Sequence, residues 1–128
     1  MSSNKCYLCI RVKPNEYIHE LRTYGFDAEE SRTIMGWIQK IYDISPIFFS
    51  GRSNRTIKAS LAYIGGHYFK KEKTENPSPN IGGDYTQRSL ADYFGCTEAS
   101  LRVNYKRIMK TMKHIFMRHK IKHYCLKN

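Results

Sequence analysis

The chain has 128 residues, enough for one domain with a buried core and too few for two domains of ordinary size. Its 22 Lys and Arg residues outnumber 11 Asp and Glu residues, which gives a net charge of +11 and favours anionic partners over cationic ones. No apolar run is long enough to cross a bilayer and the N-terminus lacks the pattern of a cleaved signal, so we expect an intracellular protein without a membrane partner.

The positive charge is concentrated towards the C-terminus. Residues 1–50 carry six basic and six acidic side chains, residues 51–83 six and two, and residues 84–128 ten and three, so the three net charges are 0, +4 and +7. The last acidic residue is Glu98. Such a one-sided field suits a polyanion, of which nucleic acid is the commonest. The alternative is a basic surface that only promotes solubility.

Residues 1–14 are predicted to form an N-terminal arm. Cys6 and Cys9 have the spacing of half a zinc site, and His119 and His123 have the gap of a zinc-finger histidine pair. The span between the two pairs is far longer than in a compact finger. We therefore expect two small packed thiols, no bound metal and no cofactor.

Two helices are predicted before residue 45. In the first, over 15–24, apolar residues recur at helical spacing and Gly25 closes the segment. Asp27 is then placed to cap a second helix, which should end at Ser45 and Pro46. We expect its apolar stripe to lie in the core, including the only tryptophan; the stripe is Ile34, Trp37, Ile38, Ile41 and Tyr42.

A third helix is predicted from Arg55 to about Lys70, with Ser53 as its N-cap. Apolar residues lie nearly all round it, which is typical of a helix at the centre of a bundle. Gly65 and Gly66 are small enough to let neighbouring helices approach closely. Residues 70–83 are polar, with two prolines and two glycines, and are predicted to form a mobile surface loop.

The stretch 86–113 has the pattern of a helix-turn-helix motif. Thr86 can cap a short helix, Gly95 can make the turn and Thr97 can start the next helix. One face of the second helix is apolar and the other is basic. The apolar positions are Leu101, Tyr105, Ile108 and Met112, and the opposite positions are Ala99, Arg102, Lys106, Lys110 and Lys113. An amphipathic hairpin with a solvated basic face is the alternative.

One position departs from this motif. Asn104 stands where many such motifs have an apolar residue, and we expect Tyr105 to supply that contact.

The domain should span residues 15–116. We expect residues 117–128 to form a basic tail, and the apolar pattern does not decide whether the helix continues into it.

The basic face suggests roles in DNA binding. Arg102 can present its two-pronged guanidinium to guanine, and Lys106 is a candidate for both base and phosphate contacts. Other exposed polar and basic residues would bind phosphates. These are Arg52, Arg55, Thr86, Gln87, Arg88, Ser100, Lys110 and Lys113.

Two segments carry a resemblance to a known family. GRSNRTIKASLAYIGGHYF, residues 51–69, resembles the third helix of a cyclin-fold repeat in transcription factor B, the archaeal and eukaryotic initiation factor. YTQRSLADYFGCTEASLRVNYKRI, residues 85–108, resembles the last two helices of that repeat, including the Thr-Glu start and the Arg-x-x-Tyr-Lys register. With the two preceding helices, the resemblance covers about 15–116.

The resemblance implies an all-α, five-helix cyclin-like repeat whose last two helices enter the major groove beside a TATA box. It also implies the TATA-binding protein or RNA polymerase as partners. In the family a small residue and an arginine read the upstream element, and these positions fall on Ala99 and Arg102. Family members have two repeats and a four-ligand zinc ribbon, whereas this chain has one repeat and at most one thiol pair.

The leading hypothesis is therefore a duplex DNA-binding protein of transcription, located in the nucleoid or in a nucleus. The alternative is a cyclin-like protein-interaction module with only non-specific DNA affinity, which an exposed apolar patch at Ile47, Phe48 and Phe49 would favour. We expect neither an enzyme nor a small-molecule substrate, because no spacing pairs a nucleophile with a base and no glycine loop could hold phosphates.

Overall fold

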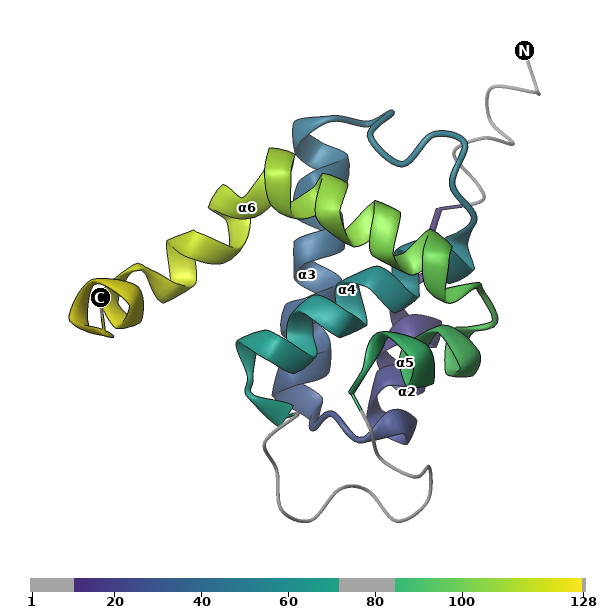
Figure 1. Ribbon diagram of the computed structural model, residues 1–128, viewed down its shortest axis with the longest axis horizontal. Helices are drawn as coiled ribbons and strands as arrows, with labels where there is room; N and C mark the ends of the chain where they lie inside the picture. The colour runs from purple at the N-terminus through teal and green to yellow at the C-terminus, as the bar shows by residue number, and fades with distance from the viewer. Residues whose placement is uncertain (1–10, 72–84, 128) are drawn as a thin grey trace.

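A computed structural model describes residues 11–71 and 85–127, with side chains described as far as Phe116. These residues form five α-helices and no strand, which confirms the predicted all-α fold with five helices (Figure 1). The helices are α2 (Pro14–Tyr24), α3 (Ala28–Ile44), α4 (Asn54–Tyr68), α5 (Gln87–Phe94) and α6 (Glu98–Lys127). In the described part of the chain, none combines the length and the apolar content needed to cross a membrane.

The helix ends follow the predicted capping residues. Asp27 accepts a hydrogen bond from the Glu30 amide at 2.7 Å, and the Glu30 carboxylate accepts one from the Asp27 amide at 2.9 Å, so α3 begins with a capping box. Ser53 Oγ accepts from the Thr56 amide at 3.2 Å at the start of α4. Helix α2 begins one residue earlier than predicted, at Pro14, because the first turn needs no amide donor from proline.

Helix α4 lies at the centre of the bundle and packs against α3, α5 and α6. Most of its residues are buried, as the all-round apolar pattern predicted. The predicted close approach occurs at Gly65: a Cβ added there would overlap the Ile34 side chain, with Cγ1 only 2.8 Å away. At Gly66 an added Cβ would lie 3.2 Å from Tyr85 Cβ, so the segment entering α5 also lies close to α4.

The core is rich in aromatic rings. Trp37 is 1% exposed, which confirms its predicted place in the core. Its ring meets Tyr68 and Phe116 edge to face, with centroids 5.1 and 4.9 Å away, and therefore joins α3 to α4 and to α6. In Figure 1, α6 crosses over α3 and α4.

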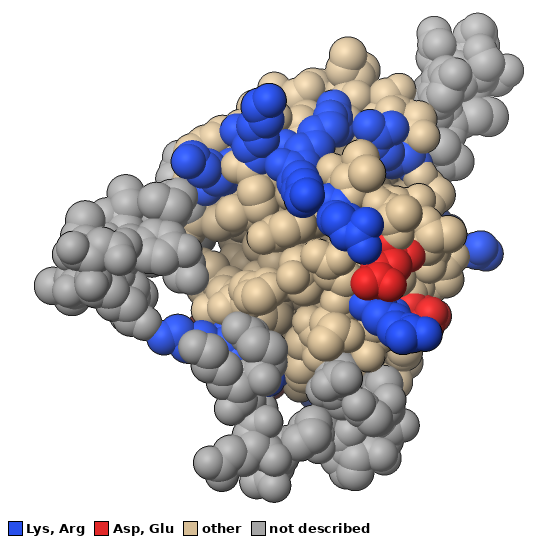
Figure 2. Space-filling view, in the orientation of Figure 1, with Lys and Arg blue, Asp and Glu red and all other residues tan. Residues whose placement is uncertain are grey.

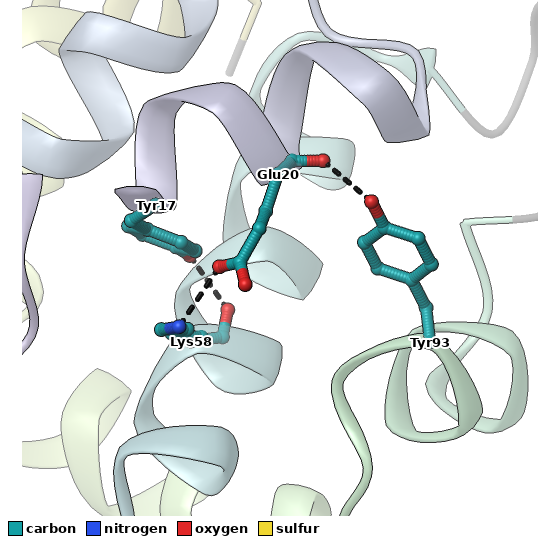
Figure 3. Close-up of polar contacts among 4 residues, drawn as sticks. All are labelled: Tyr17, Glu20, Lys58 and Tyr93. Carbon is teal, nitrogen blue, oxygen red and sulfur yellow. Dashed lines mark hydrogen bonds and ion pairs between the residues drawn. The ribbon is translucent and has the colours of Figure 1, made fainter. Parts of the chain in front are cut away.

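A polar cluster fastens α2 to α4 and α5 (Figure 3). The Tyr17 hydroxyl donates to the Lys58 carbonyl at 2.6 Å, and the Tyr93 hydroxyl donates to the Glu20 carbonyl at 3.0 Å. The Glu20 carboxylate pairs with the Lys58 ammonium at 2.8 Å. Because Tyr17 is fully buried, its hydroxyl needs this partner.

Three predicted segments lie outside the described residues or beyond the predicted end of the domain. The predicted surface loop falls mainly on 72–84, and the arm with Cys6 and Cys9 on 1–10; both lie outside the described residues. Helix α6 continues to Lys127, so the segment expected to be a tail prolongs this helix.

Candidate nucleic-acid interface

The site begins with the junction between α5 and α6. Thr86 Oγ1 accepts from the Ser89 amide at 3.1 Å, which confirms the predicted cap of α5. Gly95 ends this helix in the left-handed conformation, with φ 85° and ψ 35°, and its amide donates to the Ala91 carbonyl at 2.8 Å. A side chain is strained at such a φ, so glycine is required for the turn. The order of helix, glycine turn and helix is as predicted.

The first turn of α6 is also capped locally. Thr97 Oγ1 accepts from the Ser100 amide at 3.0 Å and donates to Ser100 Oγ at 2.8 Å. Glu98 follows, where the positive end of the helix dipole stabilises a carboxylate. Ser100 remains exposed.

Helix α6 has the two predicted faces. Leu101, Ile108 and Met112 are at most 3% exposed, and Tyr105 is half-buried with its ring edge to face against Tyr63. The opposite positions are all exposed; they are Ala99, Arg102, Lys106, Lys110 and Lys113. Figure 2 shows Lys and Arg side chains gathered along the course of α6. We call this surface the basic face of α6.

Tyr105 packs against the core beside Tyr63, as expected, but Asn104 is buried as well, which was not predicted. Asn104 is 1% exposed and lies in the core between α6 and α4. Its Nδ2 donates to Ser60 Oγ at 3.2 Å, and Ser60 Oγ donates to the Thr56 carbonyl at 2.8 Å. The buried hydroxyl on α4 therefore satisfies the amide nitrogen, whereas Asn104 Oδ1 is buried without a hydrogen-bond partner among the described residues.

Arg102 is steadied at the edge of the basic face. Its Nε donates to Gln87 Oε1 at 3.3 Å, and its Nη2 lies 3.7 Å from the Glu98 carboxylate. Both contacts are exposed and long, so each stabilises the arginine only weakly. The structure thus brings Arg102 together with Gln87, the first residue of α5.

The remaining predicted phosphate contacts lie around this junction. Thr86 and Arg88 are exposed at the start of α5. Arg55 is exposed on α4, and its Cδ lies 3.4 Å from the place where a Cβ on Gly95 would stand, so its chain covers the turn. Arg52 is exposed in the connector between α3 and α4.

Sequence reasoning missed Arg107. Its Nη1 donates to the Phe48 carbonyl at 2.7 Å, and its guanidinium carbon lies 3.8 Å from the centroid of the Phe48 ring. Burial lowers the pKa of Arg107, and the nearby charge of Arg52 lowers it further. Arg107 follows Arg102 by five residues, which is about 140° around the helix. This angle alone would have placed Arg107 at the border of the basic face.

Val103 was also missed. It is 61% exposed, and at about 100° per residue it falls between Lys106 and Arg107 on the basic face. An apolar group within a cationic face can meet a thymine methyl. Its signal in the sequence was an apolar residue out of phase with Leu101 and Ile108.

The predicted apolar patch of the connector is only partly present. Ile47 is 75% exposed, but Phe48 and Phe49 are 6% and 4% exposed, so the patch does not contain all three residues. Beside Ile47 lies an open pocket of about 380 Å³. Its lining includes Arg11, Tyr42, Ile47, Phe49, Arg52 and Ile57.

The described residues contain no group of three or more His, Cys, Asp or Glu side chains that could hold a metal ion. The residues of the zinc alternative lie outside what is described: Cys6 and Cys9 entirely, and His119 and His123 in their side chains.

Known protein families, curated proteins and solved structures were compared with the chain, and none matches it.

Proposed function

We propose that the protein binds duplex DNA in transcription by inserting α6 into the major groove. The observation that carries the proposal is the exposed basic face of α6. This helix follows a capped helix and a glycine turn in the sequence. A helix with its side chains is about 10–12 Å across and fits a major groove about 12 Å wide. Net charge of +11 adds attraction to phosphates.

Arg102 is the proposed reader of guanine. To reach the O6 and N7 atoms, its guanidinium must leave Gln87 and Glu98, and both contacts are weak enough to be exchanged. Ala99, one turn before, is small enough for a close apolar contact with a base. Lys106 follows one turn after Arg102 and can bond either a base edge or a phosphate.

The same proposal includes the architecture and the setting. The five helices would form a single cyclin-like repeat of the transcription factor B type, with the α5–α6 pair as a helix-turn-helix. The TATA-binding protein and RNA polymerase would be its candidate protein partners, and the nucleoid or a nucleus its location. The resemblance of residues 51–69 and 85–108 to that family supports this part of the proposal.

Selection from a random duplex library at two salt concentrations tests the proposal. We expect an enriched motif with guanine in its core. Arg102→Ala should reduce the preference for guanine at one base pair by about 1–3 kcal/mol. Lys110→Ala should weaken binding to all duplexes alike and reduce the slope of log affinity against log salt concentration by about 0.9. If nothing is enriched, or if both variants behave alike, sequence reading by α6 is refuted.

A second candidate function is protein binding at the connector, which the pocket beside Ile47 favours. Ile47→Asp would place a charge at the mouth of this pocket without filling a core position. If this change abolishes binding of the TATA-binding protein while the selection above enriches no motif, the interaction module is the better description. If Ile47→Asp leaves that binding unchanged, the pocket is not the docking site for this partner.

A further inference from the structure

Arg107 is held in a fixed orientation at the border of α6 and the connector. One of its five N–H groups donates to the Phe48 carbonyl at 2.7 Å, and its guanidinium carbon lies 3.8 Å from the centroid of the Phe48 ring. The side chain is half-buried, so its position is determined before any ligand arrives. No other hydrogen bond of this guanidinium is present among the described residues, so its other N–H groups can bind a ligand.

Arg52 lies in the same turn of the connector. The connector is folded by successive backbone hydrogen bonds, and the Arg52 amide donates to the Phe49 carbonyl at 3.0 Å. This carbonyl follows directly after the Phe48 carbonyl that Arg107 contacts. Consistently, the two charges are close enough for Arg52 to lower the pKa of Arg107.

Neither arginine has an acidic partner within residues 11–71 and 85–116. The ion pairs among these residues involve Glu20, Glu30 and Glu98, and none includes Arg52 or Arg107. Two neighbouring guanidinium groups without a counterion repel each other. An anion bound between them would turn this repulsion into attraction, and phosphate matches the geometry of guanidinium donors.

The two borders of the basic face point to different flanking segments. Arg102 contacts Gln87 on α5, whereas Arg107 contacts Phe48 in the connector. Five residues separate the two arginines, which is about 140° around the helix. A helix lying in the major groove has a phosphate backbone on each side. In such a complex, one border would face one strand and the other border would face the opposite strand.

We propose that Arg52 and Arg107 form a phosphate-binding site for the DNA strand opposite to the one met by the start of α5. The two sites together would hold α6 in the groove from both sides and set its register. This inference rests on the proposed duplex binding. Arg107 would act as a positioning residue, since it contacts the backbone and reads no base.

Duplexes with single neutral methylphosphonates test the site, with the selected motif as the parent sequence. The phosphates whose replacement by a methylphosphonate weakens wild-type binding should lie on both strands. One position should lose its effect in Arg52→Met and Arg107→Met. Each phosphate contact contributes about 0.9 to the slope of log affinity against log salt concentration. Replacing the phosphate at that position should therefore lower the affinity of the wild type about eight-fold at 0.1 M salt, and should hardly change the affinity of these two variants.

The variants also separate binding from a structural role. Arg107→Met could loosen the connector, so the exposed Arg52→Met provides the same test without loss of the Phe48 contacts. Arg32→Met, at an exposed position in α3, is the matched control for loss of one charge. It should leave the phosphate map unchanged.

Two outcomes would overturn the inference. In the first, the motif is read through Arg102, but the sensitive phosphates lie only on the strand beside α5. In the second, Arg107→Met lowers the melting temperature while the map stays that of wild type, which is the result of a purely structural role. Absence of any enriched motif is a different failure, because it refutes the proposed function itself.

Discussion

Tyr17 should make the stability of the protein depend on pH in the alkaline range. Its hydroxyl is fully buried in the cluster of Figure 3 and donates to the Lys58 carbonyl at 2.6 Å. Burial raises the pKa of Tyr17 well above 10, and the charge of Glu20 raises it further. Ionisation would remove the donated proton and leave a charge in the core.

The magnitude follows from proton linkage. Below pH 10 the tyrosine is protonated in both the folded and the unfolded chain, so its contribution to stability is constant. As pH rises above 10, only the unfolded chain loses the proton, and the free energy of unfolding falls by about 1.4 kcal/mol per pH unit. Tyr17→Phe loses a hydrogen bond worth about 1–1.5 kcal/mol, but it also loses this pH dependence.

The difference between wild type and Tyr17→Phe should therefore change sign near pH 11, where about one pH unit of linkage offsets the lost hydrogen bond. Urea unfolding of both proteins between pH 8 and 11.5 measures it, and other titrating groups cancel in the difference. Tyr93→Phe should show a weaker trend of the same sign, since burial also raises the pKa of Tyr93 but its side chain is only half-buried. Parallel curves for wild type and Tyr17→Phe would refute the reasoning.

Three further changes test the packing of the helices and the setting of Arg102. Gly36→Ala should stabilise α3 by up to about 1 kcal/mol in urea titrations, because an added Cβ meets nothing within 4 Å. Gly65→Ala should destabilise by about 1 kcal/mol, because overlap with the buried Ile34 outweighs the same gain in helix propensity; equal signs for the two glycines would contradict this packing. Glu98→Gln should raise duplex affinity about two-fold in a titration, because it frees Arg102 from an exposed pair worth ~0.4 kcal/mol. The gain should vanish in the Arg102→Ala background, and a gain that persists there would point to repulsion between Glu98 and phosphates instead.

The helix boundaries were predictable because their signals are local. Asp27, Ser53 and Thr86 each cap the helix that follows through an amide three residues away, and Gly95 makes its turn with a backbone that other residues avoid. The two faces of α6 followed from periodicity alone. These features need no knowledge of which helices pack together.

The errors concern residues whose surroundings come from distant parts of the chain. Ile47, Phe48 and Phe49 are consecutive and equally apolar, yet only the first is exposed, because the turns of the connector direct the two aromatic rings inward. Arg107 became half-buried because the Phe48 ring and carbonyl lie beside it, 59 positions away in the sequence. Charge and periodicity give no information on such a partner.

Asn104 shows how the core of this bundle also determines its surface. Apolar side chains alone tolerate small rotations of one helix against another, whereas the hydrogen bond from Asn104 Nδ2 to Ser60 Oγ is directional and restricts the rotation of α6 against α4. That rotation places Arg102 beside Gln87 and Arg107 beside Phe48. The buried polar residue of α6 therefore helps to determine which side chains this helix exposes.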